Sequence, residues 1–92
     1  MPKVFIVAQV EDSMKWEQGF RTHAALFRSQ TIAKPIDYGT IPGNQVAICA
    51  EPDDLAVFLK IMDSPATAEA MAFDGIKRET VRMFVLDKEF KV

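Results

Sequence analysis

The pattern of hydrophobic and polar positions along the chain predicts four strands, each a short apolar run between polar or turn-forming residues. Residues 4–10 are rich in β-branched and aromatic side chains and end at a polar stretch. Residues 36–41 and 45–50 have the same character, and residues 42–44, Pro-Gly-Asn, supply the fixed and permissive backbone of a hairpin connection. Residues 80–86 form the last predicted strand, before a polar C-terminal extension.

Between the first two strands the apolar positions follow a helical period. At about 100° per residue, residues 14–30 place Trp16, Phe20, His23 and Phe27 in one narrow arc. Most of the remaining surface of this segment is polar. We therefore expect one continuous amphipathic helix whose apolar arc faces the sheet.

Polar residues and a glycine mark the expected helix ends. Asp12 or Ser13 can cap the first helix, and Asp53-Asp54 begins a second helical region after the third strand. Ser64-Pro65 predicts a restart of that region, and Gly75 favours the left-handed backbone that ends it. The apolar face of its first part consists of Leu55, Phe58, Leu59 and Met62.

The order of these elements is strand, helix, strand, strand, helix pair, strand. A hairpin in the middle and a helix in each crossover favour an α+β, ferredoxin-like β-α-β-β-α-β fold. We expect an antiparallel four-stranded sheet with the helices on one face. A chain of 92 residues supports one hydrophobic core, so residues 1–92 are predicted to form a single domain.

The first and last predicted strands are apolar on both faces. Phe5 and Val7, and likewise Phe84 and Leu86, occupy the face opposite the one that the helices would cover. Two helical regions cover only one face, and a second copy of the chain would cover the other, which predicts a sheet-to-sheet homodimer. The alternative is that these side chains are scattered exposed hydrophobic residues.

Composition and charge exclude several partners. Lys and Arg number 11 against 13 Asp and Glu, and the net charge of −2 offers no basic field for nucleic acid. One Cys and one His allow no intrachain disulfide and no metal cluster from one chain, and we expect no cofactor. The first ten residues resemble neither a secretory signal nor a membrane span, so no membrane partner and a cytoplasmic location are expected.

Three stretches, together with this element order, resemble a known superfamily. DLAVFL at 54–59, DSP at 63–65 and AMAFDGI at 70–76 are similar to the dimeric α+β barrel superfamily. Its members include antibiotic-biosynthesis monooxygenase-like proteins, lactone isomerases, haem-degrading enzymes, small-ligand-binding regulators and many short domains of unassigned function. The resemblance implies that two ferredoxin-like subunits pair sheet to sheet and that a cavity lies between each sheet and its own helices.

The catalytic motifs of that superfamily do not match this sequence. Its oxygenase and haem-degrading branches combine an Asn on an early strand with Trp and His from other segments. Here Asn44 falls in the predicted hairpin turn, while Trp16 and His23 share one predicted helix. The resemblance therefore assigns no catalytic residue.

His23 is the polar residue of most interest because it interrupts an apolar arc. A neutral imidazole there could accept a proton as a general base or bind a ligand. Alternatively, His23 is a core or cavity-lining residue bonded to backbone or to a strand residue. Haem binding through His23 is a third hypothesis, which predicts a Soret band on titration.

The remaining candidate positions are compatible with either a pocket or ordinary packing. Tyr38 could present its hydroxyl to a cavity or lie at a strand edge. Arg82 could pair with Asp37 or Glu51, form a salt bridge at the rim of a dimer, or anchor an anionic ligand. The aromatic and methionine side chains that could line a cavity, or else form the core, are Trp16, Phe20, Phe27, Met62, Met71 and Phe73.

Two functional hypotheses follow. The first is a small homodimeric α+β barrel protein that binds a small apolar or aromatic molecule between helices and sheet. The alternative is a cofactor-independent enzyme of the monooxygenase-like or isomerase type, with His23 as proton acceptor. The predicted ligand-binding residues are Trp16, Phe20, His23, Phe27, Tyr38, Met71 and Arg82.

Overall fold

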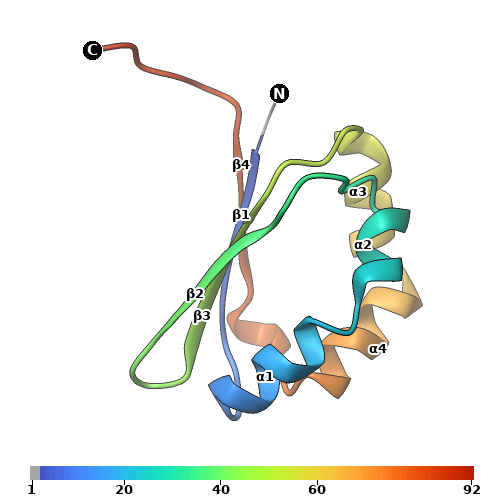
Figure 1. The fold of residues 1–92 in the computed structure, drawn as a ribbon, viewed down its shortest axis with the longest axis vertical. Coiled ribbons are helices and arrows are strands. Elements are labelled where there is room, and N and C mark those ends of the chain that lie inside the picture. The colour runs from blue at the N-terminus through green and yellow to red at the C-terminus, as the bar shows by residue number, and fades with distance from the viewer. Residues whose placement is uncertain (1–2) are drawn as a thin grey trace.

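A computed structural model describes residues 3–92 of the chain. A sheet forms one layer and the helices form the other (Figure 1). Its strands are all antiparallel and lie in the order β2-β3-β1-β4. They are β1 (Lys3–Gln9), β2 (Asp37–Ile41), β3 (Gln45–Ala50) and β4 (Arg82–Leu86).

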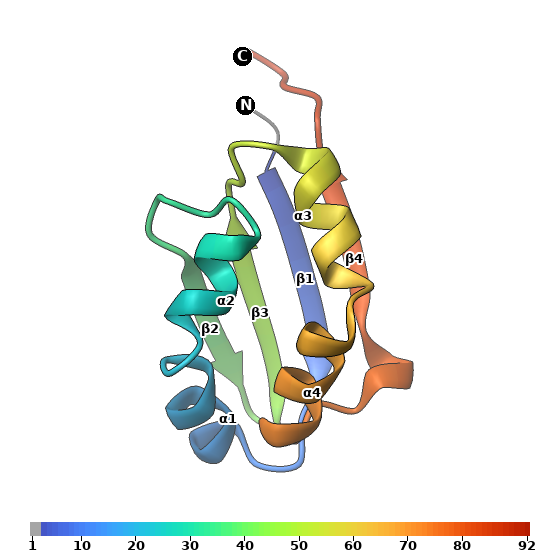
Figure 2. The same ribbon diagram turned by 90° about the vertical axis from the view of Figure 1, so that its right-hand side faces the viewer.

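The helices all cover the same face of the sheet, as Figure 2 shows from the helix side. They are α1 (Ser13–Phe20), α2 (Ala24–Ser29), α3 (Leu55–Met62) and α4 (Pro65–Phe73). The predicted ferredoxin-like α+β fold is confirmed. Among the described residues, the structure has no helix of the length and hydropathy needed to cross a membrane.

The expected single helix over residues 14–30 is wrong, because the chain forms two short helices there. After Phe20, the backbone N–H groups of Thr22 and His23 bond to carbonyls three residues back, which tightens the turn and ends α1. The Thr22 hydroxyl also donates to the Gly19 carbonyl at 2.6 Å. His23 therefore lies in the connection between α1 and α2, and its side chain is free to turn toward α4.

Two smaller expectations also need correction. The last strand begins at Arg82 because Arg78–Thr80 forms a 3₁₀ turn, in which the Thr80 hydroxyl accepts the backbone N–H of Gln9 at 2.9 Å. In α3, Phe58 is buried as expected, but Leu59 is exposed. Leu59 therefore does not belong to the buried face of α3.

The predicted helix ends are confirmed by their caps. Asp12 accepts the backbone N–H groups of α1 at Met14 and Lys15, while Asp54 and Ser64 cap α3 and α4 in the same way. Gly75 has φ of 74°, the left-handed backbone that glycine tolerates best. These local signals fix where α1, α3 and α4 begin and where α4 ends, whereas α2 begins without a side-chain cap.

The inner face of the sheet carries the core. Val4 and Ala8 of β1 and Val46 of β3 are buried against the helices. From the helix layer, Trp16 and Phe58 are almost fully buried against them. This packing leaves room for a cavity between sheet and helices.

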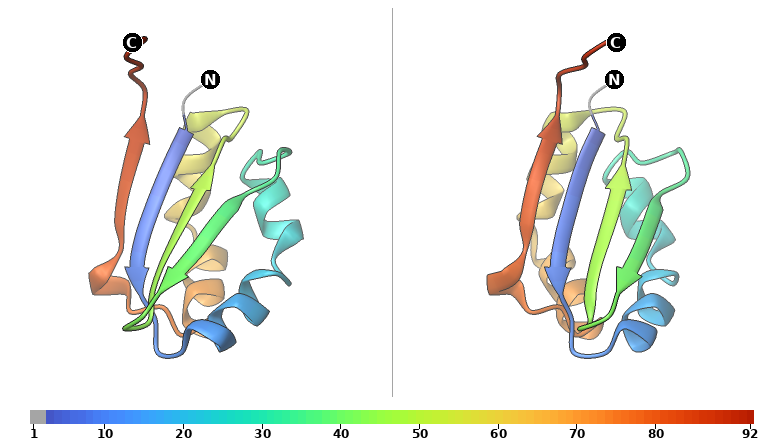
Figure 3. Two further views of the ribbon diagram at one scale, coloured as in Figure 1. Left: turned by 60° about the vertical axis from the view of Figure 1, so that its left-hand side comes forward. Right: turned by 90° about the vertical axis from the view of Figure 1, so that its left-hand side faces the viewer.

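No described element covers the outer face of the sheet (Figure 3), and on β1 and β4 this face is largely apolar. On β4, Phe84 is 53% exposed and Leu86 is 47% exposed. Phe84 pairs with Phe5 of β1, and their ring centroids lie 6.4 Å apart. The register confirms that both strands present apolar side chains on the face away from the helices.

Candidate functional site

A cavity of about 80 Å³ lies between the inner sheet face and the helices. Its lining is almost entirely apolar, and it includes side chains from β1, β3 and all four helices. Five of the predicted ligand-binding residues line it: Trp16, Phe20, His23, Phe27 and Met71.

Aromatic rings in mutual contact form the wall of the cavity beside α1. The ring centroids of Trp16 and Phe20 lie 4.9 Å apart, and those of Phe20 and Phe27 lie 5.1 Å apart. Phe73, which the sequence suggested for a pocket, is exposed and outside the lining, with its ring at the edge of His23. The aromatic wall is therefore built by α1 and α2.

Tyr38 packs against this aromatic wall from β2 but does not line the cavity. Its hydroxyl donates to Glu17 Oε2 on α1 at 2.7 Å. This hydrogen bond raises the pKa of Tyr38 above its ordinary value. The hydroxyl is thus directed to the surface of α1 and away from any cavity ligand.

Arg82 lies on the outer face of the sheet, opposite the cavity. Its guanidinium donates to the backbone carbonyls of Glu79 at 3.3 Å and Val81 at 3.1 Å. Among the described residues it forms no ion pair with either predicted acid, and Glu51 instead pairs with Lys34 at 3.2 Å. Arg82 therefore lies on the outer sheet face and does not line the cavity, where a ligand-binding role had been predicted for it.

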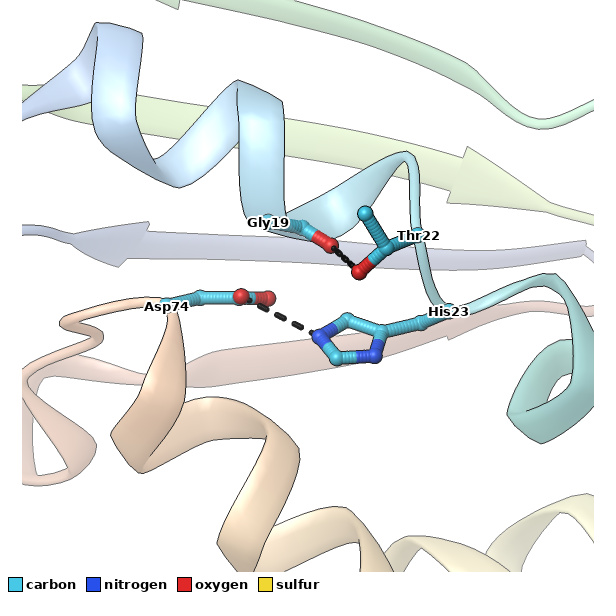
Figure 4. A network of polar contacts seen from close by, with 4 residues as sticks. All are labelled: Gly19, Thr22, His23 and Asp74. Carbon is cyan, nitrogen blue, oxygen red and sulfur yellow. Dashed lines mark hydrogen bonds and ion pairs between the residues drawn. The ribbon is translucent and has the colours of Figure 1, made fainter.

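His23 is joined to Asp74, the residue that ends α4. The distance from His23 Nε2 to Asp74 Oδ1 is 3.1 Å, and Figure 4 shows the two side chains pointing toward each other. The Asp74 side chain is 4% exposed and that of His23 is 19% exposed. Burial raises the pKa of Asp74, and the hydrogen bond and charge of His23 oppose that shift.

The Asp74 bond defines what His23 can do chemically. A carboxylate hydrogen-bonded to one ring nitrogen fixes the orientation of the imidazole. His23 Nδ1 points away from Asp74 and makes no hydrogen bond to a described residue (Figure 4). Every fully buried side-chain nitrogen among the described residues has a hydrogen-bond partner. Nδ1 has none, so it is not fully buried and can exchange a proton.

Haem does not fit this site. A cavity of about 80 Å³ is far below the roughly 300–1,000 Å³ of pockets that hold larger organic molecules. The Nε2 atom of His23 is also held by Asp74. Within residues 3–92 no group of three or more His, Cys, Asp or Glu side chains could hold a metal ion.

Sequence reasoning missed two polar residues at the cavity, Asp74 and Gln30. Gln30 follows α2, is 2% exposed and lines the cavity. Its side-chain amide approaches Thr67 of α4 and Met62 of α3. The available signal was weak: each is a polar residue at the end of an apolar helical segment, where helix caps are also polar.

Gly19 makes the close approach of Asp74 to α1 possible. A Cβ atom at this position would overlap Asp74 Oδ1, the atom that contacts His23. We expect Gly19→Ala to lower the free energy of unfolding by about 1–3 kcal/mol, as crowded buried positions do. Urea denaturation measures this change.

The control for Gly19→Ala is Gln18→Ala, at an exposed position of the same helix. It introduces the same residue type without touching Asp74, and we expect a change within about 0.5 kcal/mol. Equal stability of wild type and Gly19→Ala would contradict the packing described above.

The antiparallel sheet, the helices on one face and the cavity between them define a ferredoxin-like α+β protein. Solved structures share this fold over nearly the whole chain. They include an antibiotic biosynthesis monooxygenase (TM-score 0.69, 12% identity, 97% of this chain and 99% of that one). Also similar is SnoaB, a cofactor-independent oxygenase from Streptomyces nogalater (TM-score 0.71, 14% identity, 99% of this chain and 95% of that one).

A protein from Arabidopsis thaliana is similar as well (TM-score 0.67, 15% identity, 100% of this chain and 98% of that one). No family model and no curated protein sequence matches the chain. The chain thus has the fold of antibiotic biosynthesis monooxygenase-like proteins, and at these identities the likeness shows the fold alone.

Proposed function

We propose that the chain is a subunit of a small homodimer that binds one small apolar or aromatic molecule in the helix-to-sheet cavity. The observation that carries the proposal is the cavity itself, which has an aromatic wall and an almost wholly apolar lining. Such a lining binds ligands by removing apolar surface from water. A cytoplasmic location belongs to the same proposal.

The size of the cavity limits the ligand. At about 80 Å³ it is smaller than the roughly 150 Å³ hydrocarbon-lined cavity that admits benzene. Met62 and Met71 line it, and the flexible methionine side chain adapts to the shape of a neighbour. A single aromatic ring is therefore the largest ligand that we expect, and it enters only if these methionine side chains rearrange.

The proposed dimer rests on the outer sheet face. Phe5 and Phe84 form part of an apolar surface that none of the described helices covers. A two-fold axis parallel to this surface, in the plane between two copies, would bury it against the same surface of the second copy. Arg82 lies on the same face, where a rim contact is available.

A second candidate function is a cofactor-independent enzyme in which His23 accepts a proton. The bond between His23 and Asp74 favours it, because the carboxylate orients the imidazole and leaves its second ring nitrogen without a bonding partner beside the cavity. The fold is shared with SnoaB, a cofactor-independent oxygenase. In this candidate, Asp74 positions His23 and takes no part in the proton transfer itself.

Titration with toluene, followed by NMR, tests the binding function. We expect the wild type to bind toluene and Ala70→Leu to bind it at least about tenfold more weakly, because Ala70 lines the cavity and the larger side chain fills it. The control is Ala72→Leu at an exposed position of α4, which should bind like the wild type.

Native mass spectrometry of the untagged protein separates the two candidates. A bound small molecule recovered unchanged supports binding alone, whereas conversion of that molecule by the wild type but not by His23→Gln supports the enzyme. Toluene binding that is absent in the wild type, or unaffected by Ala70→Leu, would overturn the cavity as the binding site.

A further inference from the structure

Gln30 places a polar group inside an otherwise apolar cavity. It is 2% exposed, follows the last turn of α2 and lines the cavity. A buried side-chain amide is ordinarily bonded through both its nitrogen and its oxygen. The partners of the two ends therefore show what Gln30 does.

The nitrogen end of Gln30 is fixed by α3 and α4. The Thr67 hydroxyl donates its single proton to the Ile61 carbonyl at 2.6 Å, so it can only accept from Gln30. Gln30 Nε2 lies 3.4 Å from this hydroxyl and 3.7 Å from the sulfur of Met62, which is a second acceptor. Both neighbours accept, which places the amide nitrogen there and the carbonyl oxygen on the other side.

The oxygen end of Gln30 has no donor. No described residue donates a hydrogen bond to Gln30 Oε1. Among the described residues, every fully buried side-chain oxygen has a hydrogen-bond partner, so an oxygen without one is not fully buried. Oε1 therefore retains accessible surface, and the cavity is the space that Gln30 lines. An acceptor held in an apolar cavity gains from any donor that enters with a ligand.

We infer that Gln30 Oε1 accepts a hydrogen bond from the cavity ligand, which selects apolar molecules that carry one neutral donor, a hydroxyl or an N–H. This inference rests on the proposed binding function and adds the polar group to it. A charged donor is excluded because the lining offers it no counter-charge except Asp74, which is already bonded to His23. Gln30 is thus the specificity-determining residue of the site.

Phenol and toluene form a matched pair of probes, because the same ring carries a hydroxyl in one and a methyl group in the other. We measure the ratio of the toluene Kd to the phenol Kd by NMR titration. In the wild type we expect phenol to bind more tightly than toluene. In Gln30→Met, which removes the acceptor at similar volume, we expect the preference to fall about tenfold. The matched control Gln18→Met, on the exposed face of α1, keeps the wild-type ratio.

A measurement on the wild type alone covers the case in which Gln30→Met does not fold. The side-chain amide ¹⁵N resonance of Gln30 is expected to shift with phenol and much less with toluene. Binding of both probes with an unchanged ratio, or with no selective shift of that resonance, overturns the inference and leaves the proposed function standing. Binding of neither probe overturns both.

Discussion

The Phe84→Glu variant is expected to be monomeric at concentrations at which the wild type is a dimer. Phe84 is 53% exposed in the subunit and contacts Phe5 on the outer sheet face. Across a two-fold axis, each interface would receive two carboxylates in place of two aromatic rings. Unpaired charges in an apolar interface weaken binding strongly, so we expect the dimer Kd to rise at least about 100-fold.

Size-exclusion chromatography with light scattering at micromolar concentration measures this change against the chain mass of 10.3 kDa. The matched control is Met14→Glu, which introduces the same charge at an exposed apolar position of α1 and should remain dimeric. Phe84 makes few contacts within the subunit, so circular dichroism should show a folded variant. A dimeric Phe84→Glu would exclude this face as the interface, and a monomeric wild type would exclude the dimer.

The strands were predictable from the sequence because their signal is local. Alternation with a period of two assigns Phe5 and Phe84 to one face, and the pairing register confirms it. The start of β4 was misplaced because Thr80 is held in a 3₁₀ turn by the backbone of Gln9, at the far end of β1. A contact over that sequence separation leaves no trace in a local pattern.

The site was only partly predictable, for the same reason. The helical period correctly places Trp16, Phe20 and Phe27 at the cavity, even though α1 and α2 are separate helices, because both turn an apolar face to the sheet. The partner of His23 was not predicted. The sequence pointed to backbone or a strand, whereas Asp74 reaches His23 from the end of α4, at a distance in the chain that no periodicity spans.

Replacing His23 by Leu is expected to lower the free energy of unfolding by about 2–4 kcal/mol, because it leaves the carboxylate of Asp74 buried without its partner. In an Asp74→Asn background the same replacement should cost less than half as much, since no charge is then left unpaired. Urea denaturation of the four proteins gives both costs and their coupling. Equal costs in the two backgrounds would show that His23 and Asp74 do not act as a pair.

The pH dependence of this cost follows from the raised pKa of Asp74. A carboxyl whose pKa is higher in the folded protein contributes stability below its ordinary value of 3.8, and this contribution is lost as the pH rises through the raised value. His23 opposes the raised pKa, so its removal enlarges the loss. The destabilisation by His23→Leu should therefore grow as the pH rises from below 3.8 through the raised pKa of Asp74, and in the Asp74→Asn background this growth should be much smaller. A cost independent of pH would show that the Asp74 charge is not what His23 stabilises.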